Sequence, residues 1–278
     1  MISDAFAACE ALVRNADYDR YLSALFVPAE RRAHVLALFA FNYEVAKTAE
    51  SVSQPLAGQI RLQWWRDALD EIDVGHARRH EVVEALGETI RTHALPRALF
   101  DGLIDAHESD LTEIPFETWA EFDAYANATA GNLVRLVGRV LGNSGAVDAA
   151  ARDAGIAYAL TGLLRALPFH AAKRRLMLPL EALRATGLSQ EQIFSGTMDE
   201  NVTALVAISV QRVRAHLQNA RALAIPRSSL PALLPCCLVP LYLKRLMRPG
   251  VNLFRDPTDV PGYRRQLAML GASLRRSI

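Results

Sequence analysis

The chain has 278 residues, of which 51% are hydrophobic, 7% aromatic and 22% charged. Its 31 Lys and Arg side chains nearly balance 30 Asp and Glu, which gives a formal net charge of +1. A near-neutral chain has no general electrostatic attraction to nucleic acid, so we expect no nucleic-acid partner. The apolar fraction is too high for a disordered chain, which raises the question of where so many apolar side chains are buried.

The periodicity of apolar residues is helical along nearly the whole chain. The predicted helices are, in chain order, 28–50, 59–72, 80–93, 96–110, 115–141, 146–167, 202–224, 230–247 and 263–276. Pro28 begins the first of these, and Pro168 is expected to end the sixth. Alternating β-branched residues, internal repeats and Gly/Ser-rich linkers are absent from the sequence. The sequence therefore predicts an all-α protein with a single domain over residues 1–278.

Cysteine usage and the N-terminal residues predict the compartment. Cys9, Cys236 and Cys237 form no disulfide framework, because two are adjacent and no C-x-x-C pair occurs. The N-terminal residues show neither a secretory signal nor a transit peptide, so we expect a cytoplasmic location. The longest uncharged apolar run, 228–243, contains three prolines. It predicts a kinked helix, buried or lying on a surface, rather than a membrane span.

Several local clusters have a simple structural interpretation. Three acidic side chains in 67–71 share one helix face and could hold Mg²⁺, but a solvated face is the simpler interpretation. The acidic segment 105–110 is expected to order a loop rather than bind metal. His76 and His80 have a weak zinc-like spacing within a polar connection. Cys236 and its neighbour lack a nearby base and are expected to be inert, buried thiols.

The segment 155–179, GIAYALTGLLRALPFHAAKRRLMLP, resembles the second aspartate-rich region of the squalene/phytoene synthase family, GxAxQLTNILRDVxEDxxxGRxYLP. Segments 125–142 and 38–50 resemble the family pattern YCxxVAGxVGxxxxxxLG and its first aspartate-rich region, LYAFCRxxDDxxDE. The resemblance covers essentially the whole chain. It implies an isoprenoid-synthase-type helical bundle around a central, prenyl-sized cavity.

The resemblance fails at the residues that carry the family's chemistry. Those enzymes join two prenyl diphosphates, using Mg²⁺ ions held by two acidic clusters that face each other. The corresponding positions here are Ala46, Lys47, Glu50, Ala166, Phe169 and His170. Only Glu50 is acidic, whereas Mg²⁺ prefers several oxygen ligands and a lysine opposes it. The resemblance therefore implies a non-catalytic protein, with no catalytic residue, bound metal or cofactor expected.

A cationic set near these positions is a candidate ligand site. Side chains that could bind a phosphate or another ligand are Tyr43, Lys47, Tyr125, Arg165, Lys173 and Arg175. Cations hold phosphate directly through charge-assisted hydrogen bonds, without a metal. An isoprenoid or lipid ligand bound in this way is one hypothesis for the function.

Two further segments, FNYEVA at 41–46 and GQIRLQWWR at 58–66, resemble the branch of the family related to mitochondrial complex I assembly factors. This resemblance implies a bacterial homologue and a partner patch formed by Arg61, Gln63, Trp64 and Trp65. The alternative is packing, because adjacent tryptophans on a helix point about 100° apart and at least one could be core.

Three functions are therefore compatible with the sequence. The first is a non-catalytic protein that assists assembly of the NADH:quinone oxidoreductase, with complex I subunits or other assembly factors as partners. The second is a prenyltransferase, which would require Mg²⁺ and act in squalene, hopanoid or carotenoid synthesis. The third is a metal-independent isoprenoid- or lipid-binding protein. Paired arginines at 264–265 and 275–276 suggest peripheral contact with the inner membrane, although a solvated cationic face is the simpler interpretation.

Overall fold

A computed structural model describes residues 2–112, 114–142 and 144–278, and every element in these ranges is helical. The α-helices of the N-terminal half are α1 (Ile2–Ala16), α2 (Tyr18–Ala24), α3 (Ala29–Ala46), α4 (Thr48–Ser51), α5 (Pro55–Asp73), α6 (Glu81–His93), α7 (Arg97–Glu108), α8 (Trp119–Ala126) and α9 (Asn132–Val140). Those of the C-terminal half are α10 (Ser144–Arg165), α11 (Leu167–Ala172), α12 (Leu180–Ala185), α13 (Gln190–Phe194), α14 (Glu200–Arg221), α15 (Leu230–Leu233), α16 (Val239–Leu246) and α17 (Gly262–Arg275). Shorter turns are the 3₁₀-helices η1 (Ser109–Leu111), η3 (Arg227–Ser229) and η4 (Leu234–Leu238) and the π-helix η2 (Asn127–Gly131). The all-α prediction is confirmed.

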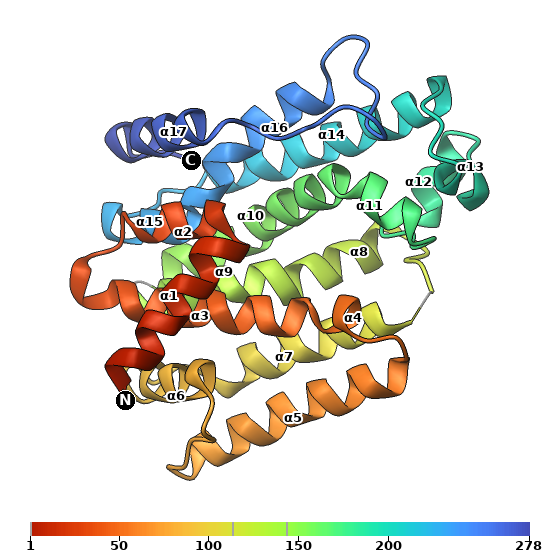
Figure 1. The fold of residues 1–278 in the computed structure, drawn as a ribbon. Coiled ribbons are helices and arrows are strands. Elements are labelled where there is room, and N and C mark those ends of the chain that lie inside the picture. The colour runs from red at the N-terminus through yellow and green to blue at the C-terminus, as the bar shows by residue number, and fades with distance from the viewer. Residues whose placement is uncertain (1, 113, 143) are drawn as a thin grey trace.

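The helices form a stacked bundle with α5 at one end and α14, α16 and α17 at the other (Figure 1). Helix α10 packs against α14, α9 and η2, while α1 crosses α3 and α6. Two apolar cores result, one around α10 and α14 and one around α3, α6 and α7. Val134 contacts both cores and joins them. The abundant apolar side chains are therefore buried mainly between helices.

A small pocket lies between α3, α9, α10 and η4. Phe39, Leu133, Val137, Tyr158 and Cys236 are among its lining residues, and its volume is about 20 Å³. That is room for roughly one water molecule. The pocket is too small for a prenyl chain, whereas the resemblance implied a prenyl-sized cavity at the centre of the bundle.

Proline positions correct two predicted helix boundaries. Pro168 does not end a helix but lies in the first turn of α11, where its missing N–H leaves no hydrogen bond unmade. The predicted helix 230–247 is instead divided into α15, η4 and α16, because prolines in its interior cannot donate to the helical ladder. The stretch Arg227–Leu246 is long and apolar enough to cross a membrane. However, 72% of its most apolar 18-residue segment is buried inside the protein. The prediction of a kinked, buried segment is therefore confirmed.

One other predicted helix is interrupted without proline, and another begins later than predicted. The helix predicted over 28–50 breaks at Lys47, where α3 ends and α4 begins. The helix predicted from Pro115 starts only at Trp119, because Thr118 accepts a hydrogen bond from the Glu121 N–H and caps it. Its continuation contains the π-helix η2 before α9. The sequence prediction also omits α1, α2, α11, α12 and α13.

Gly155 allows α10 to cross η2 at very close range. A Cβ atom at this position would lie 2.5 Å from the nitrogen and 2.7 Å from the Cα atom of Gly131. Both are backbone atoms, so no side-chain rotation relieves the clash. We expect Gly155→Ala to lower the free energy of unfolding by about 2 kcal/mol, measured by urea denaturation.

Gly162, on the same helix, provides the matched control. A Cβ there meets no atom within 4 Å. Gly162→Ala should leave stability unchanged or raise it by up to about 1 kcal/mol, since alanine is the better helix former. Equal effects of the two substitutions would contradict the close crossing.

Candidate functional site

We call the two segments that match the family's aspartate-rich regions, but lack their acidic ligands, the first and second degenerate regions. The first, at the end of α3, is organised around Glu44. Lys47 Nζ donates to Glu44 Oε1 at 2.5 Å, and Arg61 Nη2 donates to Oε2 at 3.2 Å. The Lys47 ammonium also lies 4.8 Å from the centre of the Tyr43 ring. Glu44 is buried, and a buried carboxylate needs a cationic partner. Lys47 and Arg61 supply this positive charge, so the carboxylate is not available to a metal ion. Beside it, Ala46 has no donor atom and the Glu50 side chain is exposed.

Sequence reasoning missed Glu44. The signal for its contact with Lys47 is present, because the two residues are three apart on a helix and carry opposite charges. Its second contact comes from Arg61 on another helix, which spacing alone does not reveal.

The second degenerate region begins where α10 passes into α11. Ala166 lies between the two helices and is half-buried. Phe169 is exposed, and the Lys173 ammonium lies 4.3 Å from its ring centre. His170 is buried, and its Nδ1 has no hydrogen-bond partner in the described residues. Burial, together with the nearby Arg175 cation, lowers the pKa of His170 to about 4, so the ring is neutral at neutral pH.

Asp110 is the centre of a polar network between these regions. Its Oδ2 lies 2.7 Å from His107 Nδ1 and accepts a hydrogen bond from the Tyr125 hydroxyl at 3.0 Å. Arg175 Nη2 donates to the Asp110 backbone oxygen at 2.7 Å. Burial and the Asp110 carboxylate raise the pKa of Tyr125 well above its usual range, which keeps its proton on the donor oxygen. The segment 105–110 therefore orders the chain, as its simpler interpretation predicts.

The candidate phosphate-binding cations do not meet in one groove. Arg175 lines a groove of about 430 Å³, shared with Asp110 and the segment 52–55. Arg165 lines another, of about 540 Å³, with the segment 253–259. There Arg165 Nη2 donates to Asp259 Oδ1 at 3.0 Å, and its guanidinium stacks 3.7 Å from the Tyr242 ring centre. Each of these cations already has its own partner.

The residues at the two degenerate regions do not fit a magnesium site. Two alanines contribute no ligand, Lys47 adds positive charge, and neutral His170 is a poor partner for a hard cation. In the part of the chain that the structure describes, no group of three or more His, Cys, Asp and Glu side chains is placed to hold a metal ion.

The predicted partner patch on α5 is only partly at the surface. Trp65 is 1% exposed and packs edge-on against Phe41. Trp64 is half-buried, with the Arg78 guanidinium 5.3 Å from its ring centre. Gln63 is exposed and donates to Asp67 Oδ1 at 2.7 Å. The packing interpretation therefore holds for Trp65.

The large hydrophobic residues that α5 exposes are Leu56 and Ile60, each with 63% of its surface accessible. They are four residues apart and so lie on one face of the helix. Sequence reasoning missed them, because an i, i+4 apolar pair usually indicates a buried face.

His76 is exposed, as expected for a polar connection, but His80 is half-buried, with its ring centre 5.4 Å from that of Trp64. The acidic cluster on α5 and the cysteine pair behave as their simpler interpretations predict. On α5, Asp70 pairs with Arg97 at 2.7 Å, and Glu71 pairs with Arg78 at 2.8 Å. Burial raises the pKa of Cys236 to about 12, so its thiol is protonated and unreactive.

A family model described as squalene/phytoene synthase matches residues 13–265, and the chain belongs to this family. The chain is also similar to NADH dehydrogenase (ubiquinone) complex I, assembly factor 6, of Bos taurus, with 32% identity over 269 residues, 96% of this chain and 79% of the relative. The 15-cis-phytoene synthase of Synechococcus elongatus is 23% identical over 297 residues, 100% of this chain and 95% of the relative. A crystal structure of a dehydrosqualene synthase in complex with ligand has the same fold, with a TM-score of 0.86 and 17% identity over 99% of this chain and 97% of that one.

Proposed function

We propose that this chain is a non-catalytic member of the squalene/phytoene synthase family that assists assembly of respiratory complex I, the NADH:quinone oxidoreductase. The observation that carries the proposal is the ion-paired end of α3, where Lys47 occupies a metal-ligand position and is bound to Glu44. Glu44 pairs with Lys47 and so neutralises it, and the site lacks the Mg²⁺ charge with which the family stabilises a leaving diphosphate. The 32% identity to a complex I assembly factor supports a role in the assembly of that complex.

Complex I subunits or other assembly factors are the proposed partners, met in the cytoplasm or at the inner membrane. Their proposed docking site is the outer side of α5, which lies at one end of the bundle (Figure 1). Leu56 and Ile60 expose apolar surface there, beside the amide of Gln63. An exposed apolar pair with a polar border is typical of a protein-binding surface.

We expect deletion of the gene to lower NADH:quinone oxidoreductase activity in membranes and the amount of assembled complex on native gels. The wild-type gene should restore both. A variant with Leu56→Glu and Ile60→Glu should not, because two charges would have to be desolvated in the docked complex. Both side chains are exposed, so the variant should fold normally, which circular dichroism checks.

The matched control is Val74→Glu, which places a charge at another exposed apolar position just after α5 (71% accessible). It should restore assembly as the wild type does. Unchanged complex I in the deletion strain would refute the proposal. Release of pyrophosphate from farnesyl diphosphate and Mg²⁺ by the purified chain would support the prenyltransferase instead.

A further inference from the structure

The near-zero net charge hides an uneven division of charge along the chain. Residues 1–200 contain 19 Lys and Arg against 28 Asp and Glu, a net charge of −9. Residues 201–278 contain 12 Lys and Arg against only two acidic residues, Asp256 and Asp259, a net charge of +10. Such asymmetry points to an anionic partner for the C-terminal part.

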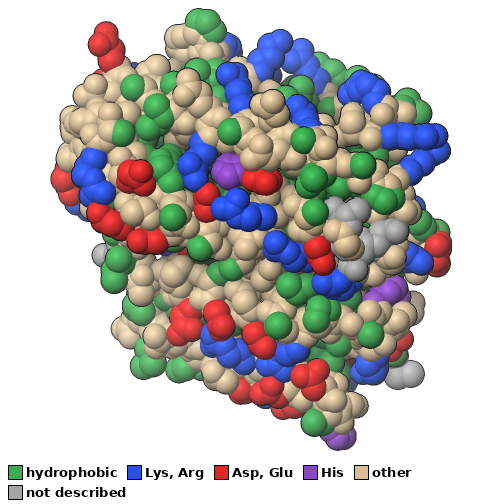
Figure 2. Space-filling view, turned by 180° about the vertical axis from the view of Figure 1, so that it is seen from behind, with side chains coloured by type: hydrophobic (Ala, Val, Ile, Leu, Met, Phe, Trp, Pro, Cys, Tyr) green, Lys and Arg blue, Asp and Glu red, His purple; other side chains and the backbone are tan. Residues whose placement is uncertain are grey.

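The fold gathers this positive charge on one end of the molecule. Helices α14, α16 and α17 lie together there (Figure 1). In the view from behind, Lys and Arg side chains follow the upper margin of the surface (Figure 2). The charge division in the sequence is therefore also a division in space.

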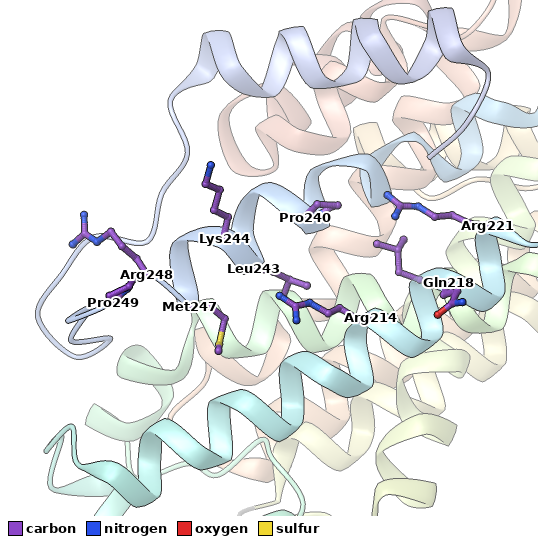
Figure 3. A pocket seen from close by; sticks show the side chains of 10 residues that line it. Arg214, Gln218, Arg221, Pro240, Leu243, Lys244, Met247, Arg248 and Pro249 are labelled. Atoms are coloured by element: carbon purple, nitrogen blue, oxygen red, sulfur yellow. The ribbon is translucent and has the colours of Figure 1, made fainter.

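A groove of about 660 Å³ runs between α14 and α16 (Figure 3). Its apolar lining residues are Leu217, Pro240, Leu243, Met247 and Pro249, and its cations are Arg214, Arg221, Lys244 and Arg248. Arg248 is 3.6 Å from Asp256, but neither Arg214 nor Lys244 has an acidic partner within the described ranges. A second groove shares Arg221 and Pro240 and continues the surface to α17.

Helix α17 carries a stripe of exposed apolar side chains. Tyr263, Leu267, Leu270 and Leu274 are 58%, 63%, 48% and 73% accessible. Their spacing of four, three and four residues places them on one face. The opposite face packs on the protein through Met269 and Ala272. The outer face of α17 is therefore apolar and uncovered.

Arginines border this stripe at both ends. Arg264 is exposed at its start, and Arg275 and Arg276 are exposed at its end. An apolar helix face bordered by cations is the pattern of helices that lie in the interface of an anionic bilayer. The long apolar segment Arg227–Leu246 is mostly buried inside the protein, so the contact would be with the surface of the membrane.

We propose that the face formed by α14, α16 and α17 docks on an anionic lipid bilayer. The leucine stripe of α17 enters the boundary between headgroups and acyl chains, and the cations of the α14–α16 groove contact lipid phosphates. A nucleic acid would satisfy the cations but leave the leucines without an apolar partner. Two copies of this face would bring positive charge against positive charge, which opposes a symmetric dimer.

Co-sedimentation with vesicles tests the proposal on the full chain. Binding should be strong to phosphatidylcholine vesicles that contain phosphatidylglycerol, negligible to phosphatidylcholine alone, and weaker at higher salt. The variant Arg214→Gln, Lys244→Gln should bind roughly 25-fold more weakly, since each cation near an anionic surface contributes about a factor of five. Leu267→Glu should weaken binding about tenfold by removing apolar burial.

Matched controls lie on the acidic part of the molecule. Ile60→Glu changes an exposed apolar side chain there, as Leu267→Glu does on α17. Arg91→Glu removes an exposed cation. Both controls should bind vesicles as the wild type does. Equal binding to neutral vesicles, or no effect of either test variant, would overturn the proposal. So would a lipid-free dimer that Leu267→Glu dissociates, or saturable binding to an acidic protein partner in place of vesicles. Because Ile60→Glu affects only the proposed α5 site, failure here is distinguishable from failure of the assembly role.

Discussion

Replacement of Asp19 by alanine is expected to lower the free energy of unfolding by about 4 kcal/mol. Asp19 is only 6% exposed and connects the first helices of the chain to the last. Its Oδ2 accepts a hydrogen bond from the Tyr242 hydroxyl at 2.5 Å, and its Oδ1 accepts one from Arg265 Nη1 at 2.7 Å. Asp19→Ala leaves a largely buried cation and a buried hydroxyl without their acceptor. Urea denaturation measures the change.

The control for Asp19 is a salt bridge at the surface. Arg184 Nη1 lies 2.8 Å from Glu117, with both side chains more than half exposed. Glu117→Ala should cost less than about 1 kcal/mol, because water replaces the lost partner. Hydrogen exchange should also speed up in α17 of Asp19→Ala but not of Glu117→Ala. If both variants lowered the free energy of unfolding by the same small amount, the prediction that burial makes the Asp19 contacts strongly stabilising would be wrong.

Helical architecture and the loss of metal ligands could both be predicted from the sequence. Apolar periodicity locates long helices such as α10 and α14 because their buried faces repeat with the helical period. The identity of Ala46, Lys47 and Ala166 needs no structure, since alanine and lysine bind no Mg²⁺ in any conformation. These two predictions depend on local pattern or on side-chain chemistry alone.

Features that depend on tertiary contacts could not be predicted in this way. Arg61 reaches Glu44 from a different helix, and no spacing rule pairs residues 17 positions apart. Leu56 and Ile60 look like a core face by periodicity, but the neighbouring elements pack on the other side of α5, where Gly58 is buried against Leu111, and leave them exposed. The volume of the central pocket depends on how side chains such as Phe39 and Tyr158 fill it.

The difference in net charge between residues 1–200 and 201–278 can be counted in the sequence, but the net charge of the whole chain conceals it. A net charge of +1 excludes a general attraction to polyanions only if the charges are mixed in space. Here residues 1–200 carry both signs with an excess of acidic residues, whereas residues 201–278 are almost purely basic. Helices α14, α16 and α17 of the basic segment lie together at one end of the bundle (Figure 1). Local charge therefore has to be counted before a partner class is excluded.

Acidification is expected to destabilise the protein between about pH 6.5 and pH 4 through His170. The pKa of His170 is about 4 in the folded protein, below its ordinary value of 6.5, because of burial first and the Arg175 cation second. Above pH 6.5 the ring is neutral in both states, so the full stability is present. As the pH falls, the unfolded chain binds the proton first, and up to about 3 kcal/mol is lost by pH 4.

Urea denaturation of the wild type and His170→Gln over this pH range measures the effect. Glutamine is of similar size and does not titrate, so its stability should fall less steeply below pH 6.5. Some slope should remain, since burial also lowers the pKa values of His34 and His93. Parallel curves for the two proteins would show that His170 takes up its proton equally in both states, as an exposed histidine does. If the buried ring is neutral, the free energy of unfolding should fall more steeply below pH 6.5 in the wild type than in His170→Gln. Above pH 6.5 the stability of both proteins should no longer depend on this residue's protonation.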